Sequence, residues 1–176
     1  MTKRLKPNIL IAGTPGTGKS RLISELMEMD QLKGFKVIHV GTFAKERGLV
    51  EEFDTLYNCD VLDEDKVVDE LEKELSTNEG GVILEYHSGD LIPSEFLDLV
   101  IVLRTNNTLL YDRLKARGYD GKKLKDNIEC EIFQTILEEA RECHEQVTEL
   151  KNETEHDLRD NCSTICDLIN KFSHVC

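Results

Sequence analysis

The chain has 176 residues, and its 35 acidic residues outnumber 22 lysines and arginines, which gives a formal net charge of −13. This length is that of one domain, residues 1–176, which can bury a core unaided. No apolar run exceeds six residues and residues 1–7 lack a hydrophobic signal segment, so we expect no membrane span and a soluble intracellular protein. The negative charge repels nucleic acid, so we expect any RNA contact to be indirect, local or delivered by a partner.

The first predicted element is a buried strand at residues 8–12, and residues 13–20 that follow it read Gly-Thr-Pro-Gly-Thr-Gly-Lys-Ser. This completes the G-x-x-x-x-G-K-[ST] pattern, in which glycines let backbone amides converge on phosphates. Lys19 is then expected to reach the β- and γ-phosphates, and the Ser20 hydroxyl to ligate Mg²⁺. Apolar residues at helical spacing predict a helix at 20–29, whose N-terminus favours an anion. The pattern therefore indicates a site for a nucleoside triphosphate.

A second strand is predicted at residues 36–40, and residues 41–62 after it have no strong core pattern. Lys45 and Arg47 lie in this segment, and we expect them to bind the acceptor phosphate of a second substrate. Solubilising surface cations are the alternative. A helix follows at residues 63–76.

The third predicted strand, residues 82–86, ends on Glu85, and His87 lies two residues further on. A carboxylate at the carboxyl end of a strand next to the phosphate loop can hold the water shell of Mg²⁺. His87 is expected to orient a water or to accept a proton, with a structural histidine as the alternative. We therefore interpret Lys19, Glu85 and His87 as catalytic.

After a fourth strand at residues 99–103, a helix at 108–117 carries Arg113 and Arg117 on one face. Phosphoryl transfer needs cations around the reacting phosphates, so we expect Arg117 to be catalytic and to bind ATP, and Arg113 to bind substrate. Two exposed solubilising arginines are the alternative. Residues 118–125, rich in glycine and lysine, are a candidate for a moving lid.

The remaining elements are one long helix at residues 127–145, a short fifth strand at 147–150 and a last helix that Asn152 and Glu155 are expected to cap. Strands that alternate with helices predict an α/β fold with a doubly wound, parallel, five-stranded sheet. The region 126–160 contains twelve carboxylates and three basic residues. It is interpreted as a solvated helix face, or as a docking surface for a basic protein.

The cysteines, which show neither a C-x-x-C pair nor zinc-finger spacing, are expected to be reduced thiols that pack as small apolar side chains. They are Cys59, Cys130, Cys143, Cys162, Cys166 and Cys176. The alternative is a metal site formed by Cys143, Cys162 and Cys166 with His144 and His156.

Several segments in chain order carry a resemblance to a known family. They are PNILIAGTPGTGKS at 7–20, LDEDKVVDEL at 62–71, EYH at 85–87, VLRT at 102–105, RGY at 117–119, KKL at 122–124 and DNI at 126–128. The chain resembles adenylate kinase isoenzyme 6, a family of small nuclear nucleoside-monophosphate kinases that are also ribosome assembly factors. The resemblance covers all but about the last 25 residues.

This resemblance implies a P-loop nucleoside-monophosphate kinase architecture, with a monophosphate-binding segment at residues 39–62 and a short lid at 116–126. It places Gly16, Gly18, Lys19, Ser20 and Arg21 on the ATP loop and Arg117 on the lid. Lys45 stands where related kinases usually have an arginine, and a lysine cannot form a bidentate fork. Glu85 replaces the commoner aspartate.

The predicted activity is transfer of a phosphoryl group from ATP to AMP or a close analogue, with Mg²⁺ and with ATPase activity in addition. The family resemblance implies a role in maturation of small-subunit (18S) ribosomal RNA beside a basic ribosomal protein, and a location in nucleus and cytoplasm. We expect a monomer. An ATPase switch that releases a ribosomal protein is the main alternative, and a small-metabolite kinase of similar build is a weaker one.

Overall fold

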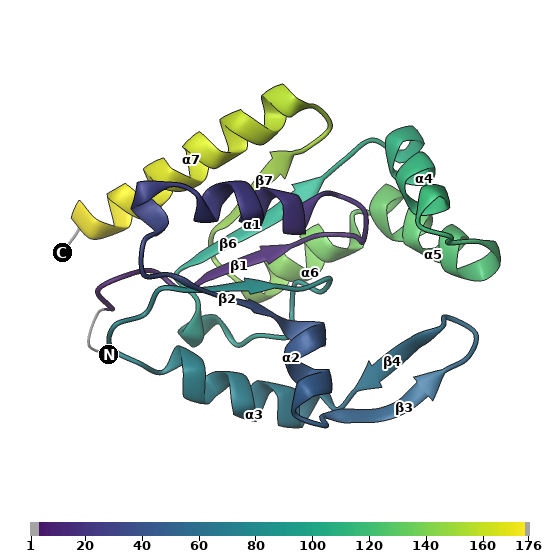
Figure 1. Ribbon diagram of the computed structural model, residues 1–176, viewed down its shortest axis with the longest axis horizontal. Helices are drawn as coiled ribbons and strands as arrows, with labels where there is room; N and C mark the ends of the chain where they lie inside the picture. The colour runs from purple at the N-terminus through teal and green to yellow at the C-terminus, as the bar shows by residue number, and fades with distance from the viewer. Residues whose placement is uncertain (1–3, 175–176) are drawn as a thin grey trace.

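Residues 4–174 are described by the computed structural model, in which five parallel strands form one central sheet (Figure 1). The strand order is β2-β5-β1-β6-β7. The strands are β1 (Ile9–Ala12), β2 (Lys36–His39), β5 (Val82–Glu85), β6 (Leu99–Arg104) and β7 (Val147–Lys151). β1, β5 and β6 are nearly continuous apolar runs because helices cover both faces of the sheet. The predicted doubly wound parallel sheet is confirmed.

Helices cover each face of the sheet (Figure 1). α1 (Lys19–Met27) and α7 (Glu155–His174) pack on one face, and α2 (Val40–Glu46), α3 (Glu64–Leu75) and α6 (Thr135–Cys143) pack on the other. Side chains of β1 alternate between the two cores: Ile9 and Ile11 face α1 and α7, and Leu10 and Ala12 face the opposite layer. α4 (Asn107–Ala116) and α5 (Gly121–Ile132) lie together beyond the end of the sheet, and two 3₁₀ turns, Asp30–Leu32 and Ser94–Phe96, complete the fold.

The predicted helix 127–145 is wrong, because it is two helices that meet at a corner. α5 already begins at Gly121, inside the glycine- and lysine-rich segment, and ends at Ile132, while α6 begins at Thr135. Gln134 between them has a left-handed backbone with φ of 58°. α6 packs so closely on the loop after β5 that a Cβ on Gly89 would lie 2.5 Å from the Ile136 carbonyl oxygen. The corner lets α6 pack there while α5 turns toward the phosphate-binding loop.

Residues 41–62, which show no core pattern in the sequence, form α2 and an antiparallel hairpin. The hairpin consists of β3 (Val50–Asp54) and β4 (Cys59–Leu62). Its strands are mostly exposed or half-buried, so the sequence lacks the alternation that predicts a strand packed on a core. The hairpin stands away from the sheet, below α4 and α5 in Figure 1.

The cap predicted for the last helix is also wrong. The Asp157 carboxylate accepts a hydrogen bond from the Thr154 amide at 2.9 Å, and the Thr154 hydroxyl accepts one from the Asp157 amide at 3.0 Å. This reciprocal pair starts α7 in place of Asn152 and Glu155. Asn152 is buried, and its side-chain amide donates to the Thr17 carbonyl at 2.8 Å. Its role is therefore to hold the phosphate-binding loop.

Cys162 and Cys166 are buried in the core between α7, α1 and the sheet, as small apolar side chains. Cys59 and Cys143 are exposed, and Cys176 lies outside the described residues. Between residues 4 and 174, no group of three or more histidine, cysteine, aspartate or glutamate side chains is arranged to hold a metal ion. Within the same range, no helix is both long and apolar enough to cross a membrane.

Candidate active site

The phosphate-binding loop, residues 13–20, joins β1 to α1 and is fixed from both sides. Gly13 has a φ of +144°, and a Cβ there would lie 2.6 Å from the Leu103 carbonyl oxygen of β6. Gly18 has a φ of +97°, and a Cβ there would lie 2.4 Å from the side-chain nitrogen of Asn152. Only glycine fits both the backbone angles and these close approaches. The loop is therefore a preformed turn at the N-terminus of α1.

Lys19 is buried at the bottom of the site, although contact with a phosphate requires its positive charge. Its ammonium donates to the carbonyl oxygens of Gly13 at 2.6 Å and Thr14 at 3.2 Å. Burial lowers its pKa to about 8; the positive charge of Arg117 reinforces this effect, and the negative charges of Glu85 and Glu131 oppose it. A bound anion would restore the charged form, so the loop is built to gain electrostatic energy from a phosphate.

Glu85 ends β5 and is held by two neighbours. One carboxylate oxygen accepts a hydrogen bond from the Ser20 hydroxyl at 2.8 Å, and the other contacts Nδ1 of His39, the last residue of β2. Parallel strands end at the same edge of the sheet, and for this reason Glu85 and His39 meet. The structure thus brings together the two oxygen donors that the sequence assigns to Mg²⁺, Ser20 and Glu85.

His87 lies beside these groups, at the mouth of the same cleft. Solvent reaches part of its ring, but the crowding of protein atoms around it, and then the charge of Lys19, lower its pKa below 6.5. The imidazole is therefore neutral at pH 7 and able to accept a proton.

A cleft of about 390 Å³ runs over the loop and connects these residues. Its lining includes Gly16, Gly18, Lys19, Ser20, Arg21, His39, Thr42, Glu85, His87 and Arg117. A second hollow of about 350 Å³ adjoins it, and Gly16, Gly18, Arg21 and Arg117 line both. Arg113, Asn152 and Glu155 line the second hollow only.

The three arginines around the second hollow differ in their contacts. Arg21 forms a two-pronged ion pair with Glu155, with nitrogen to oxygen distances of 2.6 and 2.7 Å. Arg113 donates to the carbonyl oxygens of Gly16 at 3.1 Å and Asn152 at 3.3 Å, so it supports the loop from outside the cleft. Arg117 ends α4 and lines both spaces.

Lys45 and Arg47 lie outside the lining of both spaces. The Lys45 ammonium pairs with Asp60 of β4 at 2.6 Å. Arg47 pairs with Glu70 and Glu74 of α3 at 3.4 and 3.3 Å and stacks on Phe43. Their assignment to an acceptor phosphate stays a prediction.

The turn of the β3–β4 hairpin contacts the first turn of α5, and we call this contact the rim. The Tyr57 hydroxyl donates to the Asp126 carboxylate, and the Lys122 ammonium donates to both groups. Lys123 donates to the Asn58 carbonyl at 3.5 Å. The rim thus joins the segment 39–62 to the predicted lid 116–126 across the open side of the site.

Sequence reasoning missed His39, Asn152 and Glu131. His39 could have been found, because it lies at the carboxyl end of the predicted strand 36–40, and Glu85 lies at the same end of another predicted strand. Glu131 lies on the same face of α5 as Leu124 and Ile128. An acidic residue on an otherwise apolar helix face could have indicated a buried polar contact. Nothing in the sequence marked Asn152 as a residue of the site, because an asparagine at this position is equally well explained as a helix cap.

The phosphate-binding loop, the buried lysine and the parallel sheet define a P-loop kinase. A solved shikimate kinase from Acinetobacter baumannii in complex with shikimate has the same fold, with a TM-score of 0.64, 94% coverage of both chains and 18% identity. A family model described as an AAA domain matches residues 9–134, which include the loop, the cleft and α5.

The similarity to particular relatives is much closer. The adenylate kinase isoenzyme 6 homolog of Caenorhabditis elegans is 46% identical, over 97% of this chain and 93% of the relative. That of Drosophila melanogaster is 47% identical, over 92% of this chain and 90% of the relative. The chain belongs to the adenylate kinase isoenzyme 6 family and is a kinase enzyme, so the resemblance seen in the sequence is confirmed.

Proposed function

We propose that this kinase transfers the γ-phosphoryl group of ATP to AMP or a close analogue. The observation that carries the proposal is the buried Lys19 at the bottom of a cleft that Glu85, His87 and Arg117 also line. Phosphoryl transfer is catalysed mainly by positioning and by charge, and this cleft offers amides, a lysine and an arginine around one point. The adjoining hollow, between Arg117 and Asn152, is where the rest of the ATP molecule would lie.

The residues around Ser20 fit Mg²⁺. A hydroxyl and a carboxylate, 2.8 Å apart, are oxygen donors of the kind that this ion prefers. Ser20 and Glu85 would hold the ion, with His39 fixing the carboxylate from its other oxygen. When bound, Mg²⁺ neutralises charge on the transferring phosphates.

For the acceptor, we propose Lys45 ahead of Arg47. Thr42, one helical turn before Lys45 on α2, lines the cleft. Lys45 has an exposed ammonium, and among residues 4–174 it forms one ion pair, with Asp60. Arg47 is engaged by two carboxylates and by Phe43, so more contacts must break before it can bind a phosphate.

A product assay tests the reaction. Incubation with ATP and Mg²⁺, with and without AMP, should give ADP formation that depends strongly on AMP. ADP formed at the same rate without AMP would contradict a kinase as the main activity.

A second candidate, ATP hydrolysis that drives release of a partner, is favoured by His87. A neutral imidazole in the cleft, near both Lys19 and Glu85, can orient a water for attack on the γ-phosphate. Kinase and ATPase activity would then share one site, and the same assay gives their ratio.

We also propose that the partner is a basic protein of the small ribosomal subunit, and that the kinase acts in maturation of small-subunit (18S) ribosomal RNA, in nucleus and cytoplasm, as a monomer. Exposed carboxylates on and just after α6, Glu138, Glu142 and Glu145, support a cationic partner, as does the net charge of −13. Contact with RNA would be indirect.

Charge reversal of these three glutamates tests the docking surface. Capture of basic ribosomal proteins by the wild type should weaken between about 50 and 200 mM salt. The triple variant should lose capture, and unchanged capture would make this surface a solvated helix face only. Fractionation of cells into nucleus and cytoplasm tests the location.

A further inference from the structure

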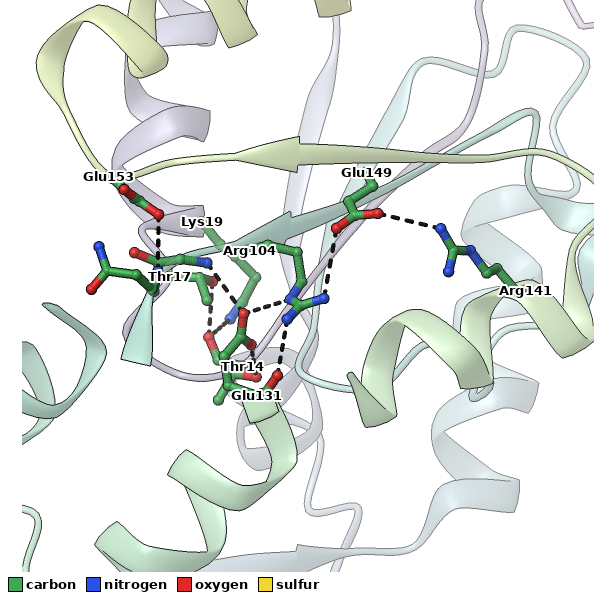
Figure 2. Close-up of polar contacts among 10 residues, drawn as sticks. Thr14, Thr17, Lys19, Arg104, Glu131, Arg141, Glu149 and Glu153 are labelled. Carbon is green, nitrogen blue, oxygen red and sulfur yellow. Dashed lines mark hydrogen bonds and ion pairs between the residues drawn. The ribbon is translucent and has the colours of Figure 1, made fainter. Parts of the chain in front are cut away.

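A buried polar cluster joins the last turn of α5 to the phosphate-binding loop (Figure 2). The Glu131 side chain is 2% exposed, and one of its carboxylate oxygens accepts a hydrogen bond from the Thr14 hydroxyl at 2.6 Å. The other accepts from Nε of Arg104 at 2.5 Å and from the Thr105 amide at 3.2 Å. One carboxylate therefore connects α5, the loop and the end of β6.

Each group that contacts the Glu131 carboxylate donates a hydrogen bond to it. Burying a lone carboxylate is costly, and here an arginine and two further donors offset that cost. Arg104 also donates to the Glu131 backbone carbonyl at 2.9 Å and pairs with Glu149 of β7 at 3.6 Å. The guanidinium is thus held in place on both sides, and it fixes the position of the carboxylate.

Thr14 links this cluster to the catalytic lysine. Its carbonyl oxygen accepts hydrogen bonds from the Thr17 hydroxyl at 2.9 Å, from the Thr17 amide at 3.2 Å and from the Lys19 ammonium at 3.2 Å. Figure 2 shows Glu131, Thr14, Thr17 and Lys19 gathered at this point. If Thr14 moved, the turn of the loop and the lysine would both lose a partner.

We propose that Glu131 is a positioning residue for ATP: its carboxylate holds Thr14 and, through Thr14, sets the phosphate-binding loop and Lys19 for the triphosphate. This inference rests on the proposed use of the loop for ATP. Glu131 contacts the phosphate-binding loop through Thr14, and its negative charge also acts on Lys19. Both routes lead to the triphosphate, so the effect of Glu131 belongs to the ATP side of the reaction and not to the AMP side.

The test is Glu131→Gln, with Glu129→Gln as the matched control: Glu129 is a half-exposed glutamate of the same helix that pairs with Lys125 at 3.5 Å. The amide keeps the shape of the side chain but removes the charge that pairs with Arg104. Its N–H group must also face either Arg104 and Thr105, which only donate, or the Thr14 hydroxyl, which then has to reverse its hydrogen bond. Affinity for a non-hydrolysable ATP analogue, measured by calorimetry, should fall tenfold or more, while the KM for AMP should stay within about twofold. Glu129→Gln should change neither. Equal losses of both affinities, or an ATP affinity within twofold of the wild type, would overturn the proposal.

Thr14 supplies the second arm, which also serves if Glu131→Gln fails to fold. Thr14→Val removes the hydroxyl at nearly constant volume, and it leaves the pairing of Glu131 with Arg104 intact. It should weaken binding of the analogue, and Thr14→Ser, which keeps the hydroxyl, should restore it. In the double variant the two losses should not add, because both break one link. Additive losses, or a Thr14→Val variant that binds normally, would overturn the route through Thr14.

Failure of the proposed function would give other results than failure of the inference on Glu131. If the wild type does not bind the analogue, or if Lys19→Met binds it as well as the wild type, the loop is not the ATP site. In either case the proposed function fails, whatever the Glu131 variants do.

Discussion

The phosphate-binding loop and the rim both lie toward the carboxyl ends of the sheet strands (Figure 1), but different kinds of contact hold them in place. Buried polar groups hold the loop: its own Thr14 and Thr17 bond with Glu131 of α5 and with Asn152, which follows β7. The rim consists of side chains at the ends of surface segments, with Lys122 about half exposed. Buried hydrogen bonds are costly to lose, whereas solvent screens exposed ion pairs. The difference indicates a fixed ATP site beneath a contact that breaks easily.

The substitution with the largest expected effect at the phosphate-binding loop is Lys19→Met. Loss of one preorganised charge at the phosphates lowers turnover by about 10² to 10³. The fold should persist, because the side chain fills the bottom of the cleft and a methionine of similar length can occupy it. Steady-state ADP formation and circular dichroism check both points. Retention of more than about half of the wild-type turnover would contradict the role of the loop.

Lys19→Met should also change how the free energy of unfolding depends on pH in the absence of nucleotide. The pKa of Lys19 is about 8 in the folded protein against 10.5 ordinarily, so the unfolded chain binds more protons between these values. The unfolding free energy of the wild type should therefore gain, from this group, up to about 3 kcal/mol as pH rises across that interval. Lys19→Met should lack this gain. Urea unfolding of both proteins between pH 7 and 10 measures the difference.

Arg117 lies between the two regions, at the end of α4, and tests whether the lid contributes to catalysis. A lid arginine that meets the transferring phosphoryl group stabilises the transition state more than the bound substrate. Arg117→Ala should lower kcat by about tenfold or more and change ATP affinity by less than about threefold. A rise in the KM for ATP alone would make Arg117 a binding contact and the lid assignment wrong.

His87 separates transfer from hydrolysis. In transfer the phosphate of AMP is the nucleophile, whereas hydrolysis needs an oriented water, so His87→Gly should reduce ATPase activity several-fold more than kinase activity. Because the pKa of His87 is lowered, the pH midpoint at which its share of ATPase activity falls should lie below the ordinary histidine value. Both rates are measured on one preparation, and equal losses would make His87 a structural residue.

The smallest effect is expected at the rim. Tyr57→Phe removes the hydroxyl that joins the hairpin to Asp126 and Lys122. It should change kcat or the KM for AMP by only about two- to threefold, and thermal stability hardly at all, because all three side chains reach solvent. Tyr111→Phe, at an exposed tyrosine of α4, is the control. A large loss of stability would show that the rim is as firmly held as the loop.

The strands, the loop and the edge at which Glu85 and His87 lie were predictable, because buried parallel strands and the glycine–lysine pattern are local signals. The corner at Gln134 was not, because the apolar periodicity continues through it and only packing of α6 on Gly89 decides the break. The β3–β4 hairpin was missed because its strands cover little core. The partners of Glu131, Thr14 and Arg104, lie in distant segments, and spacing along the chain does not encode how these segments meet.

The corner between α5 and α6 has a mechanical consequence. Glu131 anchors one end of α5, and Lys122 lies nine residues earlier, about 14 Å away along the helix axis. A tilt of about 10° around the anchored end would move Lys122 by about 2 Å, enough to break a hydrogen bond at the rim. Near the pivot the same tilt would displace atoms by only a fraction of an ångström. A tilt of α5 would therefore break the contacts of the rim while it leaves the contact between Glu131 and Thr14 almost unchanged.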